Sequence, residues 1–175
     1  MEAWDVLVIG DGPAALRSAS VSAKNGAKTL LISATALGNG DLSALDGLAA
    51  PIQEMNNRGH REDTIKSGYF LCDQDIVTAK TNMAIDEMIH LEKAGVVFSR
   101  DAKGLPLTNK GIGHSSPRIV DAGDASVRDV QQVLEEQCMK NGVVRRGDQL
   151  PVMLVCTKQK VDGVITLDMV NGRFV

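Results

Sequence analysis

The clearest chemical signal in this sequence is a short glycine-rich segment that directly follows the apolar run Val6–Ile9. Its residues are Gly10, Asp11, Gly12, Pro13, Ala14 and Ala15. The spacing is typical of a turn that binds the diphosphate of a dinucleotide: the first glycine permits a tight reversal, the second lets the diphosphate approach, and a small third residue lets a helix lie against the strand. The free N–H groups and the dipole of that helix would hold the anion, and Pro13 is tolerated because a first-turn N–H has no helical partner.

The residues around this turn predict a β-α-β unit. Residues 6–9 suit a strand that is buried on both faces, and residues 29–32 form a second apolar strand. Between them, small or apolar residues recur on one helical face, namely Leu16, Ala19 and Ala23. Gly26 is expected to end that helix. The strand-helix-strand context makes the prediction of a dinucleotide site more specific than the glycine motif does alone. The alternative interpretation is a β-α-β unit that binds no ligand.

The residues after the second strand bear on which dinucleotide would bind. A plain NAD site places Asp or Glu there to hold the ribose, whereas this chain has Ser33 and Ala34. A neutral hydroxyl would then hold the ribose. The sequence therefore argues against an ordinary NAD site and leaves FAD open.

Length and composition are those of one ordinary globular domain, with 175 residues, 43% hydrophobic and 23% charged. The net charge of −3 and the scattered basic residues disfavour binding to nucleic acid. The first residues lack a basic leader segment, and no apolar run approaches the roughly 18 residues of a membrane span. We therefore expect a cytoplasmic protein without direct membrane insertion, linked to a membrane only through a partner.

The cysteines and histidines are dispersed along the chain, at Cys72, Cys138, Cys156, His60, His90 and His114. Their spacing argues against a disulfide framework and predicts no metal site. Cys138 and Cys156 fall within predicted elements and are expected to be small buried hydrophobes. Cys72, His114 and Ser115 have no visible base and orienting partner, which favours structural roles and leaves no catalytic residue to assign.

The middle of the chain predicts a loop, helices and a hairpin. Residues 41–57 are typical of a long loop, and residues 64–93 predict two or three helical pieces ended by Gly95. The expected inward positions of these helices are Ile76, Ala79, Met83, Ile85 and Met88. Residues 96–99 and 105–108 are expected to pair as a small hairpin.

The last third predicts one helix followed by strands. Asp124 is expected to cap a helix that runs to Asn141 and ends at Gly142. Its apolar side comprises Val127, Val130, Val133, Leu134 and Cys138. Strands are expected at residues 150–157 and 164–170, and Asn171 and Gly172 are a strong hairpin signal.

Several segments match, in one order, the pattern of a known family of flavoproteins. They are DVLVIGDGPAALRSA, the strand end at Ser33, LSALDGLAA, HREDTIKSGYFLCDQD, LEKAGVVFSRDAKG and GHSSPRIVDAGDASVRDVQQVL. Together they resemble the flavoprotein subunit of the succinate dehydrogenase and fumarate reductase family, which includes L-aspartate oxidase. The resemblance implies an α/β fold: a Rossmann-like FAD-binding domain of three layers, with a parallel sheet and a small antiparallel β-meander from about Leu150.

The resemblance also implies where FAD would lie. Residues 10–15 would hold the diphosphate, and the adenosine ribose would lie near Ser33 and Ala34. The adenine would rest near Leu150 and Pro151. The loop over the isoalloxazine ring would contribute Gly40, Asp41, Ser43, Ala44 and Gly47.

Departures from the family pattern refine these expectations. Gly40 stands where some members carry the histidine that attaches FAD covalently, so the flavin is expected to be non-covalent. The usual Gln-Gly-Gly of the same loop is replaced by Leu45, Asp46 and Gly47, and an added carboxylate would disfavour an anionic reduced flavin. The family continues for several hundred residues, so the resemblance implies that residues 1–175 are the N-terminal part of a truncated FAD-binding domain. The capping domain and helical domain are then absent.

Three functions remain open at this stage. The first is the FAD-binding portion of a fumarate reductase or succinate dehydrogenase flavoprotein, which acts on a dicarboxylate and exchanges electrons with an iron-sulfur subunit. The second is an L-aspartate oxidase. The third is a non-catalytic remnant or assembly subunit in which the altered loop no longer holds FAD.

Overall fold

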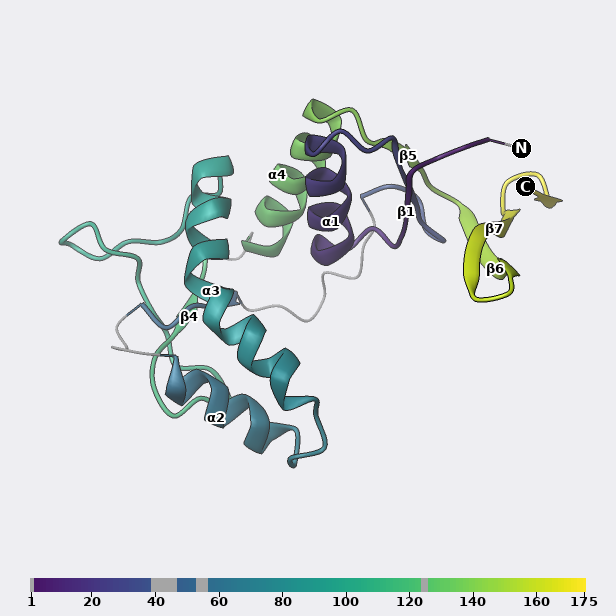
Figure 1. Cartoon of the computed structure of the whole chain (residues 1–175). Helices are drawn as coiled ribbons and strands as arrows, with labels where there is room; N and C mark the ends of the chain where they lie inside the picture. The colour runs from purple at the N-terminus through teal and green to yellow at the C-terminus, as the bar shows by residue number, and fades with distance from the viewer. Residues whose placement is uncertain (1, 39–46, 53–56, 124–125) are drawn as a thin grey trace. The chain divides into compact units, whose positions relative to one another are not determined.

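The computed structural model describes residues 2–38, 47–52, 57–123 and 126–175 (Figure 1). The chain divides into two compact units. One unit comprises Met1–Ser43 and Gln131–Val175, and the other comprises Ala44–Val130.

A three-stranded parallel sheet forms the centre of the first unit, in the order β1-β2-β5. Its strands are β1 (Val6–Ile9), β2 (Thr29–Ile32) and β5 (Val144–Arg146). Helix α1 (Pro13–Lys24) connects the first two strands, which pair in parallel from Val6 opposite Thr29 to Ile9 opposite Ile32. These elements confirm the predicted β-α-β unit.

Burial differs between β1 and β2. Every residue of β2 is buried, whereas β1 is half-buried and Ile9 is 48% exposed. The prediction that residues 6–9 are buried on both faces is therefore wrong for the described structure. The physical reason is position in the sheet: β2 lies between two strands, whereas β1 pairs only with β2 among the described strands.

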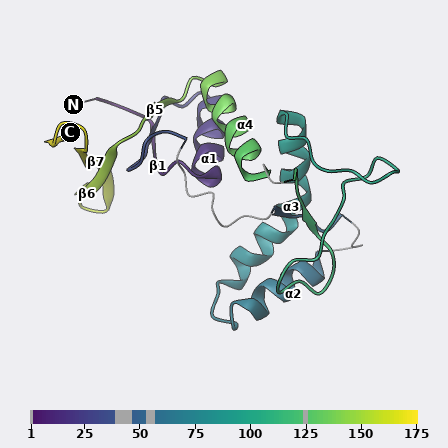
Figure 2. The same ribbon diagram turned by 180° about the vertical axis from the view of Figure 1, so that it is seen from behind.

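Helix α4 (Ser126–Lys140) lies beside α1, as both views show (Figures 1 and 2). The thiol of Cys138 donates to the carbonyl oxygen of Leu16 at 3.2 Å, and the side-chain amide of Asn141 donates to the hydroxyl of Ser20 at 2.9 Å. Burial raises the pKa of the Cys138 thiol, as expected for a small buried hydrophobe. Cys156 is exposed on its strand, so the same expectation is wrong there.

The predicted end of α4 is confirmed, because Gly142 adopts φ +77 just beyond the helix. Its predicted N-cap, Asp124, lies outside the described residues. Of the predicted apolar positions, Val130, Leu134 and Cys138 are buried and Val133 is half-buried.

An antiparallel meander follows β5, as predicted. Its strands are β6 (Gln149–Thr157), β7 (Lys160–Asp168) and β8 (Arg173–Phe174). The predicted hairpin at residues 171–172 is confirmed, since it joins β7 to β8 and Gly172 has φ +70. β7 begins four residues before the predicted start, because Lys158 takes the left-handed conformation (φ +58) in the preceding turn without a glycine to mark it.

The second unit contains two helices and a two-stranded antiparallel sheet. The helices are α2 (Arg58–Ser67) and α3 (Gln74–Ala94), and the strands are β3 (Leu48–Ala49) and β4 (Ile119–Val120). The split into two helices and the end at Gly95, which has φ +125, confirm the prediction, although α2 begins before residue 64. Asp73 caps α3 by accepting from the N–H groups of Asp75 and Ile76. β3 lies within residues 41–57, which were predicted as a loop.

The predicted inward face of α3 is largely wrong. Ile76 and Met83 are 53% and 54% exposed, and of the predicted positions only Met88 is buried. The buried residues of α3 are Val77, Thr81, Met88 and Leu91. The helix carries apolar residues on more than one side, so its periodicity did not identify the side that packs.

The predicted hairpin between residues 96–99 and 105–108 is confirmed. The N–H of Leu107 donates to the carbonyl oxygen of Ser99, and that of Asp101 donates to Leu105, each at 2.8 Å. Among the described helices, none has the length and apolarity that a membrane span requires.

Candidate functional site

The glycine-rich turn joins β1 to α1 in the conformation that its sequence predicts. Gly10 has φ +122, a value that favours glycine, and its N–H donates to the carbonyl oxygen of Ile32 at 2.8 Å. A Cβ on Gly10 would lie 3.4 Å from the Cβ of Ala15. Small residues at both positions therefore let α1 begin directly against the strand.

The first turn of α1 suits an anionic ligand. Gly12 is the N-cap in an extended conformation, no side chain caps this helix end, and no acidic residue lies in the first turn. A Cβ built on Gly12 would meet no atom of the described residues within 4 Å, so these residues leave the space beside the turn open. The N–H groups at the start of α1, including those of Ala14 and Ala15, have no partner within the helix. This geometry fits the diphosphate of a dinucleotide.

A chain of polar side chains links the turn to the end of β2. The hydroxyl of Thr35 donates to Oδ2 of Asp11 at 2.9 Å. The hydroxyls of Thr35 and Ser33 lie 3.0 Å apart, and the backbone N–H of Thr35 donates to the Ser33 hydroxyl at 3.1 Å. No local pattern predicts this link, because Asp11 and Thr35 are 24 positions apart.

Ser33 is only 2% exposed, and its backbone bonds to two strands. Its N–H donates to the carbonyl oxygen of Arg146 at 2.9 Å, and its own carbonyl oxygen accepts from Gln149 at 2.8 Å. The following residue, Ala34, is exposed. At this end of β2, the side chain of Thr35 is exposed and that of the adjoining Asp11 is half-buried, whereas Ser33 is buried.

The same backbone bond brings the start of β6 to the end of β2. Leu150 and Pro151, the predicted neighbours of the adenine, directly follow Gln149 in β6, where they pair with Leu167 and Thr166. The structure therefore places these two residues in the same unit as the turn and beside the strand end at Ser33.

Of the predicted flavin loop, the structure describes Gly47 alone. Gly40, Asp41, Ser43 and Ala44 lie outside the described residues. Gly47 has φ +147, and a Cβ there would come within 2.4 Å of the carbonyl oxygen of Val120. Glycine is required at this position because β3 approaches the backbone of β4 so closely.

Gln131 of α4 anchors the turn from a distant part of the sequence. Its side-chain amide donates to the carbonyl oxygen of Asp11 at 2.8 Å and to Glu135 at 2.9 Å, and the residue is buried. Sequence reasoning missed this contact, because 120 positions separate Gln131 from Asp11 and no local motif marks it.

Replacing Gln131 with leucine should lower the free energy of unfolding by about 1–2 kcal/mol, because the carbonyl group of Asp11 loses its donor. Urea unfolding followed by circular dichroism measures this change. Gln132→Leu is the matched control, since Gln132 is exposed on the same helix and bonds only to Glu136. Equal unfolding midpoints for the two variants would contradict an anchoring role.

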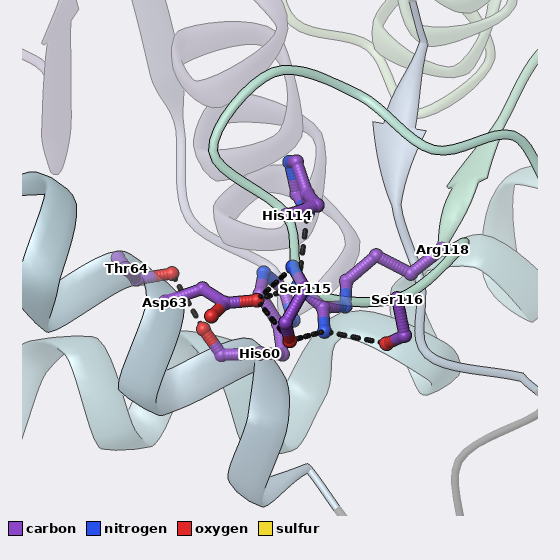
Figure 3. Close-up of polar contacts among 7 residues, drawn as sticks. All are labelled: His60, Asp63, Thr64, His114, Ser115, Ser116 and Arg118. Atoms are coloured by element: carbon purple, nitrogen blue, oxygen red, sulfur yellow. Dashed lines mark hydrogen bonds and ion pairs between the residues drawn. The ribbon is translucent and has the colours of Figure 1, made fainter.

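A second polar cluster lies in the other unit, around the fully buried side chain of Arg118 (Figure 3). Its guanidinium donates to Asp63 of α2 at 2.7 Å and to Ser116 at 2.8 Å, and it lies 2.9 Å from Nδ1 of His114. The backbone N–H and hydroxyl of Ser115 both donate to Asp63 at 2.7 Å.

The contacts of this cluster favour a structural role over a catalytic role for its side chains. Burial raises the pKa of Asp63, but hydrogen bonds from Ser115 and Arg118 outweigh it and hold the pKa well below the ordinary range of an aspartate. The Ser115 hydroxyl donates to Oδ2 of Asp63, which also accepts from Arg118, and the described contacts give this hydroxyl no imidazole base. Ser115 therefore fastens the loop to α2, and His114 contacts the Arg118 guanidinium within the loop.

The sequence also predicts that the cysteines and histidines form no metal site. Within the described residues, no group of three or more His, Cys, Asp or Glu side chains could hold a metal ion.

Comparison with known proteins agrees with the geometry of the turn. The family model described as "FAD binding domain" matches residues 5–175. The succinate dehydrogenase flavoprotein subunit of Rickettsia felis is 29% identical over 97% of this chain and 30% of its own length. L-aspartate oxidase 2-b of Nicotiana tabacum is 32% identical over 79% of this chain and 22% of its own length.

A solved structure of quinol fumarate reductase from E. coli superimposes with a TM-score of 0.88 and 25% identity, covering 98% of this chain and 30% of that one. The chain thus spans less than a third of the length of these relatives. The α/β fold with a parallel sheet and an antiparallel meander is shared over nearly the whole chain. Because the family model covers all but the first four residues, this chain belongs to the FAD binding domain family and is related to succinate dehydrogenase, fumarate reductase and L-aspartate oxidase flavoproteins.

Proposed function

We propose that this chain is the FAD-binding portion of a fumarate reductase or succinate dehydrogenase flavoprotein and holds FAD without a covalent bond. The observation that carries the proposal is the uncapped start of α1 behind Gly10 and Gly12, with open space beside Gly12. When bound, FAD supplies two-electron chemistry, the exchange of a hydride with a dicarboxylate.

The residues of this chain would position FAD from the first unit. The backbone of residues 10–15 would hold the diphosphate, the adenosine would lie by the strand end at Ser33 and Ala34, and the adenine would rest near Leu150 and Pro151. The loop residues Gly40, Asp41, Ser43, Ala44 and Gly47 would lie by the flavin ring. Titrating the chain with FAD and following flavin fluorescence tests the proposal, and a titration without any saturable change would refute it.

The bound flavin should be released intact when the protein is denatured. Gly40 has no side chain that could form a bond to the flavin. After acid precipitation of the FAD complex, we expect all of the yellow colour in the supernatant, and no flavin fluorescence on the protein band of a denaturing gel. A fluorescent band would contradict non-covalent binding.

The identity of the substrate is the part of the proposal that has a specific alternative. Relatives of the succinate dehydrogenase and L-aspartate oxidase types match this chain at 29% and 32% identity, so L-aspartate is the alternative substrate. No residue of this chain is assigned to catalysis. Assays of the flavin-loaded protein, in the assembly in which it works, with fumarate, succinate and L-aspartate would distinguish the two activities. A failure to bind FAD would instead favour the third function, a non-catalytic remnant or assembly subunit.

The proposed partner is an iron-sulfur electron-transfer subunit, and the proposed location is the cytoplasm, with membrane attachment through partner subunits. The support is that several matched relatives carry the name of a succinate dehydrogenase flavoprotein subunit. Purifying the tagged protein from its source and measuring iron and acid-labile sulfide tests this proposal. A preparation without either would contradict it.

A further inference from the structure

The end of β2 has a carboxylate beside it, although the sequence after that strand has none. In plain dinucleotide sites, an acid at the end of the second strand accepts hydrogen bonds from the ribose hydroxyls. Here the acid comes from the glycine-rich turn: Oδ2 of Asp11 accepts from the hydroxyl of Thr35, three residues beyond β2, at 2.9 Å. The carboxylate is thereby held beside the end of β2, next to the residues that follow this strand.

The bond to Thr35 also decides what this carboxylate could contact. A carboxylate free to turn toward the start of α1 would repel a diphosphate there, because both are negatively charged. Thr35 holds it instead toward the loop after β2. Its second oxygen, Oδ1, accepts no hydrogen bond from the described residues and so retains its acceptor capacity.

The neighbouring acid, Glu135, already has polar partners. Glu135 of α4 lies near Gly38 in the same loop, but its Oε1 accepts from Gln131 at 2.9 Å and its Oε2 lies 3.5 Å from Arg145. The hydroxyl of Ser33 is buried and bonded to Thr35. Asp11 is thus the acid at this strand end that lacks a cationic partner among the described residues.

We propose that Asp11, positioned by Thr35, accepts the hydrogen bonds of the adenosine ribose hydroxyls and so selects nucleotides with an intact ribose. The inference rests on the proposed binding of a nucleotide diphosphate at residues 10–15. A ribose hydroxyl donates and a carboxylate accepts, so the pair forms a charge-assisted hydrogen bond. A nucleotide without that hydroxyl forfeits the bond.

The test compares ADP with 2′-deoxy-ADP, by calorimetric titration of the full chain. The wild-type protein should bind ADP about 10-fold or more tightly than 2′-deoxy-ADP, the range expected for a hydrogen bond to a charged group. Asp11→Ala should bring this ratio close to one. ADP and 2′-deoxy-ADP carry the same diphosphate, so a change in repulsion toward the diphosphate alters both affinities equally. The ratio of the two affinities therefore reports the ribose contact alone.

Three further variants distinguish a ribose contact of Asp11 from a purely structural role. Thr35→Val should lower the ratio because the carboxylate is no longer held, and Thr35→Ser should restore it. Glu135→Gln is the matched control, since it removes a nearby negative charge and should keep the wild-type ratio.

An unchanged ratio in Asp11→Ala would overturn the inference and leave Asp11 as a link between the turn and the loop. A ratio lost in Glu135→Gln but kept in Asp11→Ala would assign the ribose to Glu135 and overturn it as well. If the wild-type chain binds neither ADP nor FAD, the proposed function itself fails, and the inference falls with it. Binding of both nucleotides with equal affinity by the wild type would refute the inference while leaving the proposed function intact.

Discussion

Gly12→Val will weaken FAD binding by about 100-fold or more, because a side chain at the N-cap of α1 keeps the diphosphate from the backbone N–H groups. Each hydrogen bond to a charged group contributes about 1.5–3 kcal/mol, so losing two of them suffices for this effect. The fold should persist, since a Cβ on Gly12 would meet no atom within 4 Å and its backbone φ of −73 is open to other residues. Fluorescence titration with FAD measures the affinity, and circular dichroism checks the fold.

Gly163→Val is the matched control for this experiment. Gly163 lies in β7 of the same unit, and a Cβ there would also meet no atom within 4 Å. Its valine variant should bind FAD as the wild type does. Retained affinity in Gly12→Val, or equal losses in both variants, would show that the diphosphate does not lie at this turn.

Arg118→Leu will destabilise the second unit by about 3 kcal/mol, because it leaves the partly buried carboxylate of Asp63 without its cation. The side chain of Arg118 is 0% exposed and that of Asp63 is 13% exposed, so water cannot replace the lost partner without rearrangement. Hydrogen exchange of the amides in residues 58–67 and 111–120 reports this unit directly. Protection there should fall, while that of residues 6–32 should change little.

Arg58→Leu provides the comparison within the same helix. Arg58 pairs with Glu62 on the surface of α2, where both side chains are well exposed. Exposed pairs contribute little because water solvates both charges. Similar losses of protection in Arg58→Leu and Arg118→Leu would argue that burial of the ion pair is not what stabilises the unit.

The Asp63 carboxylate should also make the second unit sensitive to acid. Its pKa is lowered in the folded protein, so the unfolded chain binds more protons at low pH. The stabilisation is complete above the ordinary aspartate pKa of about 4 and is lost as the pH falls below it. Asp63→Asn should reduce the difference in hydrogen exchange protection between pH 7 and pH 3. An undiminished difference in that variant would assign the acid sensitivity to other carboxylates.

Local constraints made the nucleotide turn predictable. Gly10 is needed for a backbone φ that other residues rarely adopt, and Ala15 is small because α1 starts against the strand. Gly95 and Gly142 mark helix ends for the same conformational reason. Because such constraints act within a few residues, the sequence by itself determined the β-α-β unit, the family resemblance and the conformation of the glycine-rich turn.

Tertiary structure decided the features that depend on distant residues. The predicted burial of residues 6–9 on both faces is wrong, since the neighbours of a strand in the sheet are not encoded locally, and most of the predicted inward positions of α3 are wrong as well. No local pattern predicts the contacts of Arg118 with Asp63, or of Asp11 with Thr35 and Gln131. Each of these pairs forms only when segments 24 to 120 positions apart are packed together, because a hydrogen bond depends on where the chain brings its atoms and not on their spacing in the sequence.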